Sequence, residues 1–117
     1  MKLTSASAER NVAPILAVLL QKLAHATALL EIASGTGQHA AALAQALPVL
    51  RVQPTEYAGG AGSPEATAHD DLEPLFASIR EWGAPFSPRV LPPIALDASA
   101  AAWPVDEERY DAIFASN

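Results

Sequence analysis

The residues best suited to chemistry lie in one stretch, residues 29–40, which joins an apolar run to an alanine-rich segment. Glu31 lies near the end of the apolar run, and Gly35 and Gly37 follow it, separated by one residue. Glycine tolerates positive φ and lets the backbone approach a ligand closely, and the first turn of a helix presents unpaired N–H groups. A strand, a tight loop and a helix in this order predict a binding site for a small-molecule cofactor.

Two classes of cofactor are compatible with such a site. The spacing Gly35-x-Gly37-x-x-Ala40 satisfies the loose glycine pattern of dinucleotide-binding folds, which hold the pyrophosphate of NAD. Glu31 favours a different cofactor, because a carboxylate on a buried strand is costly unless it has a partner. The α-ammonium of S-adenosylmethionine (SAM) would pair with that carboxylate, whereas a pyrophosphate would be repelled by it. An acid that is merely solvated at a strand end is the alternative.

The pattern Glu31-x-x-x-Gly35-x-Gly37 resembles the first motif of class I SAM-dependent methyltransferases, with Ala33 where those proteins often have glycine. More narrowly, several blocks in the same order resemble the methyltransferase-like 26 family and extend along nearly the whole chain. These blocks are Ser7-Ala8-Glu9-Arg10-Asn11, Pro14-Ile15-Leu16, the segment from Glu31 to Ala40, Gln53-Pro54 and Leu96-Asp97. The resemblance implies a Rossmann-like domain that binds SAM for methyl transfer to an acceptor that it does not identify.

A second carboxylate has the spacing expected for ribose binding. Glu56 lies 19 positions after Gly37. A βαβ unit needs a spacing of about 20 residues to bring an acid from its second strand to the ribose hydroxyls. A carboxylate accepts from both hydroxyls at once, so residue type and spacing agree. The alternative is a loop acid in solvent.

The resemblance extends these assignments to a full set of site residues. Its cofactor residues are Glu31 for the ammonium, Ser34, Gly35, Thr36 and Gly37 for the methionyl end, Glu56 for ribose and Asp97 for the adenine amino group. Its substrate-side residues are Arg10, Asn11, His39 and Asn117, and no catalytic base is assigned. Asp97 would otherwise cap a turn, Arg10 would cap local carbonyls or pair with Glu9, and His39 would be a packing or solvated histidine.

Composition limits the other classes of function. The 117 residues carry a net charge of -6, and the seven basic residues are scattered, which disfavours a nucleic-acid partner. The chain has no cysteines and its three histidines are far apart, so no metal site is predicted. The apolar segment 12–20 is too short to span a bilayer, and no secretory signal is evident. These features are typical of a cytoplasmic protein with no membrane partner.

The elements that must position these residues follow from hydrophobic spacing. Helices are predicted from a Ser7 cap to Leu23, from Gln38 to Leu47, and from Leu72 to Trp82 with Pro74 in its first turn. In the first of these, Pro14 makes the segment before it either a separate turn or a kinked start. Strands are predicted at Ala28–Ile32, at Val49–Gln53 with Pro54 ending the pairing, at Ile94–Leu96, and at Tyr110–Ala115 as an interior strand. Residues 58–71 have the composition of a flexible loop. Right-handed crossovers then predict an α/β domain with a parallel sheet, which the resemblance orders 3-2-1-4.

The resemblance covers only part of its family's domain. The class I methyltransferase sheet has seven strands, so residues 1–117 are expected to form a single incomplete domain that is truncated after the fourth strand. We therefore expect no turnover by this chain alone, and self-association through the exposed edge of that strand. An NAD-binding domain of an oxidoreductase and a non-catalytic binding module are the alternative functions.

Overall fold

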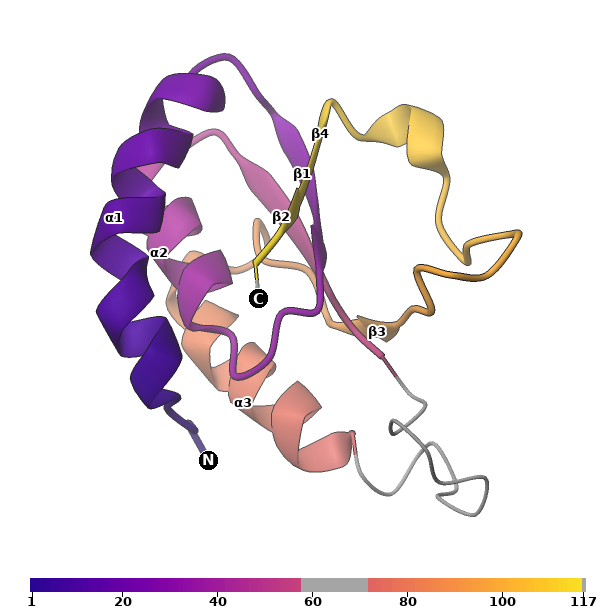
Figure 1. Cartoon of the computed structure of the whole chain (residues 1–117), viewed down its shortest axis with the longest axis horizontal. Helices are drawn as coiled ribbons and strands as arrows, with labels where there is room; N and C mark the ends of the chain where they lie inside the picture. The colour runs from indigo at the N-terminus through magenta and orange to yellow at the C-terminus, as the bar shows by residue number, and fades with distance from the viewer. Residues whose placement is uncertain (58–71, 117) are drawn as a thin grey trace.

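The computed structural model describes residues 1–57 and 72–116, and it shows an α/β fold (Figure 1). The elements in chain order are α1 (Ala6–Lys22), β1 (Ala28–Ile32), α2 (Gln38–Ala46), β2 (Arg51–Glu56), α3 (Glu73–Gly83), the 3-10 turn η1 (Ala84–Phe86), β3 (Ile94–Ala95), the 3-10 turn η2 (Glu107–Arg109) and β4 (Ala112–Ala115). The predicted loop at residues 58–71 and Asn117 lie outside the described residues.

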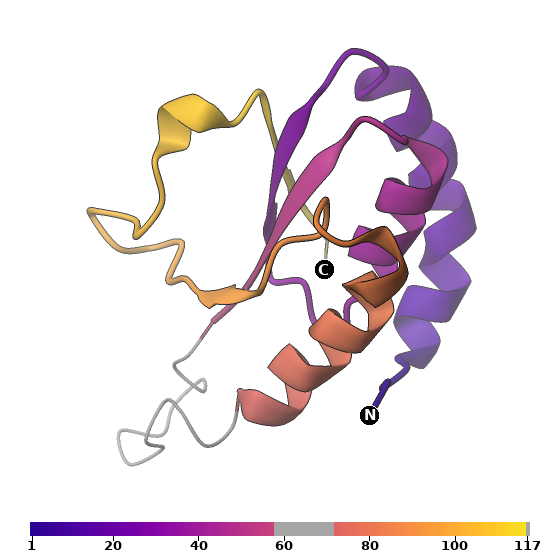
Figure 2. The same cartoon turned by 180° about the vertical axis from the view of Figure 1, so that it is seen from behind.

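The four strands form one parallel sheet in the order β3-β2-β1-β4, which confirms the predicted strand order. α2 connects β1 to β2, and α3 lies in the connection between β2 and β3, as parallel pairing requires. The helices α1, α2 and α3 lie side by side along the same face of the sheet in both views (Figures 1 and 2). The order in which strands are added to the sheet therefore reverses at β1, because β2 and β3 lie on one side of it and β4 lies on the other.

The core fills the space between the sheet and the helices. Leu29 on β1, Leu43 on α2, and Leu50 and Val52 at β2 have at most 1% of their surface exposed and belong to one cluster. Alanines on the inner face of α2, such as Ala40, let this helix approach the sheet closely. This packing fixes the end of β1 and the start of α2, which are the two elements that flank the glycine loop.

The start of α1 differs from the prediction. Ser5, not Ser7, is the N-cap, and its hydroxyl accepts from the Ala8 N–H at 3.4 Å. The helix continues through Pro14, so the separate turn predicted before this residue is wrong, whereas the alternative of a kinked start stays a prediction. Pro14 and Arg10, whose carbonyl loses its helical partner, are both exposed, so water can replace the missing hydrogen bond. Arg10, expected on a separate turn, is therefore inside the helix.

The prediction that Pro54 ends the second strand is also wrong, because β2 continues to Glu56. The Val52 N–H donates to the Arg89 carbonyl at 2.8 Å on the β3 side of the strand. By the alternation of a strand, the nitrogen two residues later faces that same side. Regular pairing on that side resumes only at Ile94. Pro54 lies in the gap, so its missing N–H removes no ladder hydrogen bond.

The fourth strand is not buried on both faces as predicted. β4 pairs with β1 and lies at the edge of the described sheet. Ile113 is 58% exposed, whereas Phe114 packs against the core cluster. An uninterrupted apolar run indicates a strand but does not reveal how many neighbours the strand has.

Among the described residues, none of the helices has the length and apolar character needed to cross a membrane.

Candidate functional site

The loop between β1 and α2 has a conformation that few residues adopt. Ala33, Gly35 and Gly37 have φ values of 56°, 59° and 97°. Gly37 is also sterically required, because a Cβ atom there would lie 2.8 Å from the Cα atom of Ile79 on α3. Ala33 adopts the left-handed conformation despite its Cβ, which is uncommon and stores strain of the kind that clusters at ligand sites.

Glu31 is the unusual residue of this region, because it is a buried acid on the central strand. Its side chain is 1% exposed, and its Oε1 atom has no hydrogen-bond partner among the described residues. The pKa of Glu31 is raised from 4.5 to about 7, chiefly by burial; a hydrogen bond with the Ser34 side chain acts against this rise, and the Glu56 carboxylate contributes to it. Buried polar groups are nearly always hydrogen-bonded, so an unpaired carboxylate oxygen needs a specific explanation.

Glu56 lies at the end of β2, adjacent to the glycine loop. Its Oε2 atom accepts from the Gly35 N–H at 2.7 Å, and its Oε1 atom accepts from the Tyr57 N–H at 2.9 Å. The structure thus brings together Glu31, Glu56 and the loop at the carboxyl ends of β1 and β2. In open α/β sheets, ligands bind at these strand ends, next to the point where the strand order reverses.

The other two loop residues of the predicted site make structural contacts. The buried Ser34 donates its N–H to the Thr55 carbonyl at 2.7 Å and accepts from the Thr55 N–H at 3.1 Å. The Thr36 hydroxyl donates to the Gln38 side chain at 2.6 Å, and the Thr36 carbonyl accepts from the Ser78 hydroxyl at 2.7 Å. These contacts fix the loop on β2 and α3.

Asp97 lies two residues after β3 and is exposed. Its Oδ1 atom accepts from the Ser99 hydroxyl at 2.6 Å and from the Ser99 N–H at 2.9 Å. The hydroxyl, followed by the N–H, holds the pKa of Asp97 below its ordinary value. The carboxylate therefore caps a turn, which is the alternative that the sequence left open for it.

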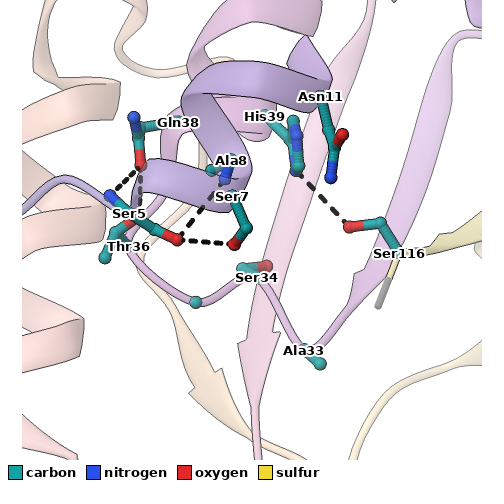
Figure 3. Close-up of a pocket in the computed structure, with 11 residues that line it drawn as sticks. Ser5, Ser7, Ala8, Asn11, Ala33, Ser34, Thr36, Gln38, His39 and Ser116 are labelled. Atoms are coloured by element: carbon teal, nitrogen blue, oxygen red, sulfur yellow. Dashed lines mark hydrogen bonds between the residues drawn. The ribbon is translucent and has the colours of Figure 1, made fainter. Parts of the chain in front are cut away.

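A small polar pocket lies between the start of α1 and the glycine loop (Figure 3). Its volume is about 120 Å³, and it is lined by Ser5, Ser7, Ala8, Asn11, Ala33, Ser34, Gly35, Thr36, Gln38, His39 and Ser116. No charged side chain lines it among the described residues. Small-molecule sites usually enclose about 300–1,000 Å³, so this pocket holds one end of such a ligand at most.

The predicted substrate-side residues separate in the structure. Asn11 and His39 line the pocket, whereas Arg10 is exposed on α1 and does not line it. The Nδ1 atom of His39 lies 3.4 Å from the Ser116 hydroxyl, and the buried Nε2 atom has no partner among the described residues. Burial lowers the pKa of His39, so the neutral imidazole is favoured at pH 7.

Sequence reasoning did not identify several lining residues. Ser5 could have been recognised, because serine is a preferred N-cap residue and Ser5 directly precedes the helical segment. Gln38 and Ser116 have no comparable signal, since their roles depend on contacts with segments far away in the sequence.

In the described part of the chain, no group of three or more His, Cys, Asp or Glu side chains is placed to hold a metal ion.

The fold and the site together define a class of protein: a parallel α/β domain with a glycine loop and two neighbouring carboxylates at the carboxyl end of its central strands. The sequence profile of a family described as a protein of unknown function (DUF938) matches residues 2–117. The chain therefore belongs to this family. No solved structure matches the chain significantly.

Proposed function

We propose that this chain is a Rossmann-like, SAM-dependent methyltransferase-like domain that binds SAM at the carboxyl end of β1. The observation that carries the proposal is the buried carboxylate of Glu31 with its unpaired Oε1 atom. A buried carboxylate with one oxygen that has lost its water without gaining a partner favours a cationic ligand group. The α-ammonium of SAM is such a group, and a charge-assisted hydrogen bond in a dry site is strong.

The donors and acceptors of the neighbouring residues are compatible with the remaining parts of SAM. An ionised carboxylate offers about four acceptor positions. Glu56 uses two of them for backbone N–H groups, so it retains capacity for the ribose hydroxyls. Both bonds from Ser99 go to Oδ1 of Asp97, and among the described residues Oδ2 is left for the adenine amino group. Loop residues 34–37 would hold the methionyl end.

Bound SAM would supply an activated methyl group on a sulfonium sulfur for transfer to a nucleophile. The role of the protein is to bind SAM, to orient it and the acceptor, and to exclude water. Such positioning alone lowers reaction barriers by several kcal/mol. We place the acceptor side at the polar pocket, where Asn11 and His39 face the loop. The neutral imidazole of His39 orients an acceptor group there, and no residue is assigned as catalytic base.

Differential stabilisation tests the choice of cofactor. At 100 times its dissociation constant, a ligand stabilises the folded state by about 2.7 kcal/mol, which for a chain of this size raises the melting temperature by about 10 °C. SAM and S-adenosylhomocysteine should produce such a shift at sub-millimolar concentrations, and NAD should not. Glu31→Gln should reduce the shift, whereas the matched control Glu107→Gln, an exposed acid on η2, should retain it.

The dehydrogenase alternative makes the opposite prediction. The spacing of Gly35, Gly37 and Ala40 still fits a dinucleotide loop, but the pyrophosphate would lie near the buried carboxylate of Glu31. A larger melting shift with NAD than with SAM would therefore exclude the SAM proposal and favour the dehydrogenase reading. No shift with any of the three ligands would favour a non-catalytic module.

A further inference from the structure

We infer that Ser78, on α3, is a positioning residue for the glycine loop, and that residues 3–5 ahead of α1 complete a clamp on that loop. Ser78 is fully buried. Its hydroxyl donates to the Thr36 carbonyl at 2.7 Å and accepts from the Leu3 N–H at 2.8 Å. One hydroxyl group on α3 thus joins the loop to the segment ahead of α1, which lies 75 residues before Ser78 in the sequence.

A second side chain makes the same kind of bridge from α2. The Oε1 atom of Gln38 accepts from the Ser5 N–H at 2.9 Å and from the Thr36 hydroxyl at 2.6 Å (Figure 3). Trp82, one turn after Ser78 on α3, donates its ring N–H to the Leu3 carbonyl at 2.8 Å. Thr36 is therefore held through its carbonyl and its side chain by two elements, each of which also binds residues 3–5.

The loop depends on such external contacts, because little in its own sequence stabilises its conformation. Gly37 is the N-cap of α2 and has no side chain with which to cap it. Ala33 has an unfavourable positive φ. A serine within a helix commonly bonds back to a carbonyl of its own helix, but the Ser78 hydroxyl is directed to the loop instead. Ile79, the next residue, packs so close to Gly37 that a Cβ atom there would lie 2.8 Å from the Ile79 Cα atom, so α3 lies against the loop at two adjacent residues.

The clamp couples residues 3–5 to whatever the loop binds. The part of this inference that concerns ligand affinity rests on the proposed function, whereas the part that concerns the loop conformation does not. Coupling between two sites is reciprocal, so a ligand that orders the loop also strengthens the hold on residues 3–5. SAM should accordingly slow hydrogen exchange at the Ser5 N–H, which lies in a different segment from the loop.

The test combines amide hydrogen exchange with ligand titration on Ser78→Ala. In this variant the Gly35, Gly37 and Ser5 amides should exchange about tenfold faster, and the amides of β1, which report global opening, should keep the parent rate. SAM affinity should fall about three- to tenfold, as expected for losing one or two net hydrogen bonds. Thr4→Ala, which removes an exposed hydroxyl from the same segment, is the control and should change neither.

Gln38→Ala releases the second bridge and provides an independent variant, for which we expect the same pattern. Exchange at the parent rate in the loop amides of both variants would overturn the inference. An equal acceleration of the loop and β1 amides would also overturn it, because Ser78 would then act only on global stability. If the parent chain does not bind SAM, the proposed function fails, while the exchange measurement still decides whether Ser78 positions the loop.

Discussion

Glu31→Gln should change how the stability of this protein depends on pH, independently of any ligand. The pKa of Glu31 is raised from 4.5 to about 7 by burial. Between these two values the folded chain holds a proton that the unfolded chain has released. Stability therefore falls as the pH rises through this window, and it levels off above pH 7. Glutamine, which has nearly the shape of the protonated acid, never ionises and should remove this loss.

The size of the effect follows from the two pKa values. The interval from 4.5 to about 7 corresponds to about 3 kcal/mol, at ~1.36 kcal/mol per pH unit. At pH 8, Glu31→Gln should thus be more stable than the parent by about 3 kcal/mol, and near pH 4.5 the two should differ little. This is a large fraction of the total stability of a domain of this size.

Urea unfolding of the parent and the variant from pH 4.5 to 8 measures this difference. His39 contributes with the opposite sign, because burial lowers its pKa and its contribution to stability is lost as the pH falls through 6.5. His39 is present in both proteins, so its effect cancels in the difference curve. Glu107→Gln is the matched control and should follow the parent. A pH-independent difference between Glu31→Gln and the parent would refute the argument that burial raises the pKa of Glu31.

Three further substitutions test the supports of the site and the sheet edge. Gly37→Ala should destabilise the chain by about 3 kcal/mol in urea unfolding, because its new Cβ atom would meet the backbone of Ile79 at a positive φ. Arg89→Ala should cost about 2 kcal/mol, since the guanidinium donates at 2.9–3.2 Å to two carbonyls at the end of α2 and to the Leu50 carbonyl before β2; an unchanged unfolding midpoint would contradict this. Ile113→Lys should shift the chain towards the monomer in size-exclusion chromatography with light scattering, because it puts a charge on the exposed β4 edge; a parent that is already monomeric would contradict the expected self-association.

Most of the fold could be predicted from hydrophobic spacing and breaker residues. β1 has its predicted bounds, and α2 ends one residue before the predicted position because Pro48 follows closely. The separate turn predicted before Pro14 and the strand end predicted at Pro54 were wrong for a common reason. A proline ends an element where the lost hydrogen bond cannot be replaced, whereas the Pro14 region is exposed to water and Pro54 lies in a gap of the ladder.

The site could be predicted only in part, for reasons of sequence distance. Glu31 and Glu56 were recognisable because an acid at the end of an apolar run, and another about one βαβ unit later, have few structural explanations. Ser78 has the appearance of an ordinary helix serine, and its role appears only when α3 lies against the loop. The orientation of Asp97 towards Ser99 likewise depends on the turn that follows it, which spacing does not specify.

Calorimetric titration of SAM into the parent chain and into Glu31→Gln tests the central claim most directly. The parent should bind, and the variant should lose about 1.5–3 kcal/mol of binding free energy, which is more than a tenfold weakening. At pH 6.5, SAM binding to the parent should also release about 0.8 proton, because Glu31, with a pKa of about 7, must ionise to pair with the ammonium, and the variant should release none. Equal SAM affinity and equal proton release in the two proteins would contradict the account.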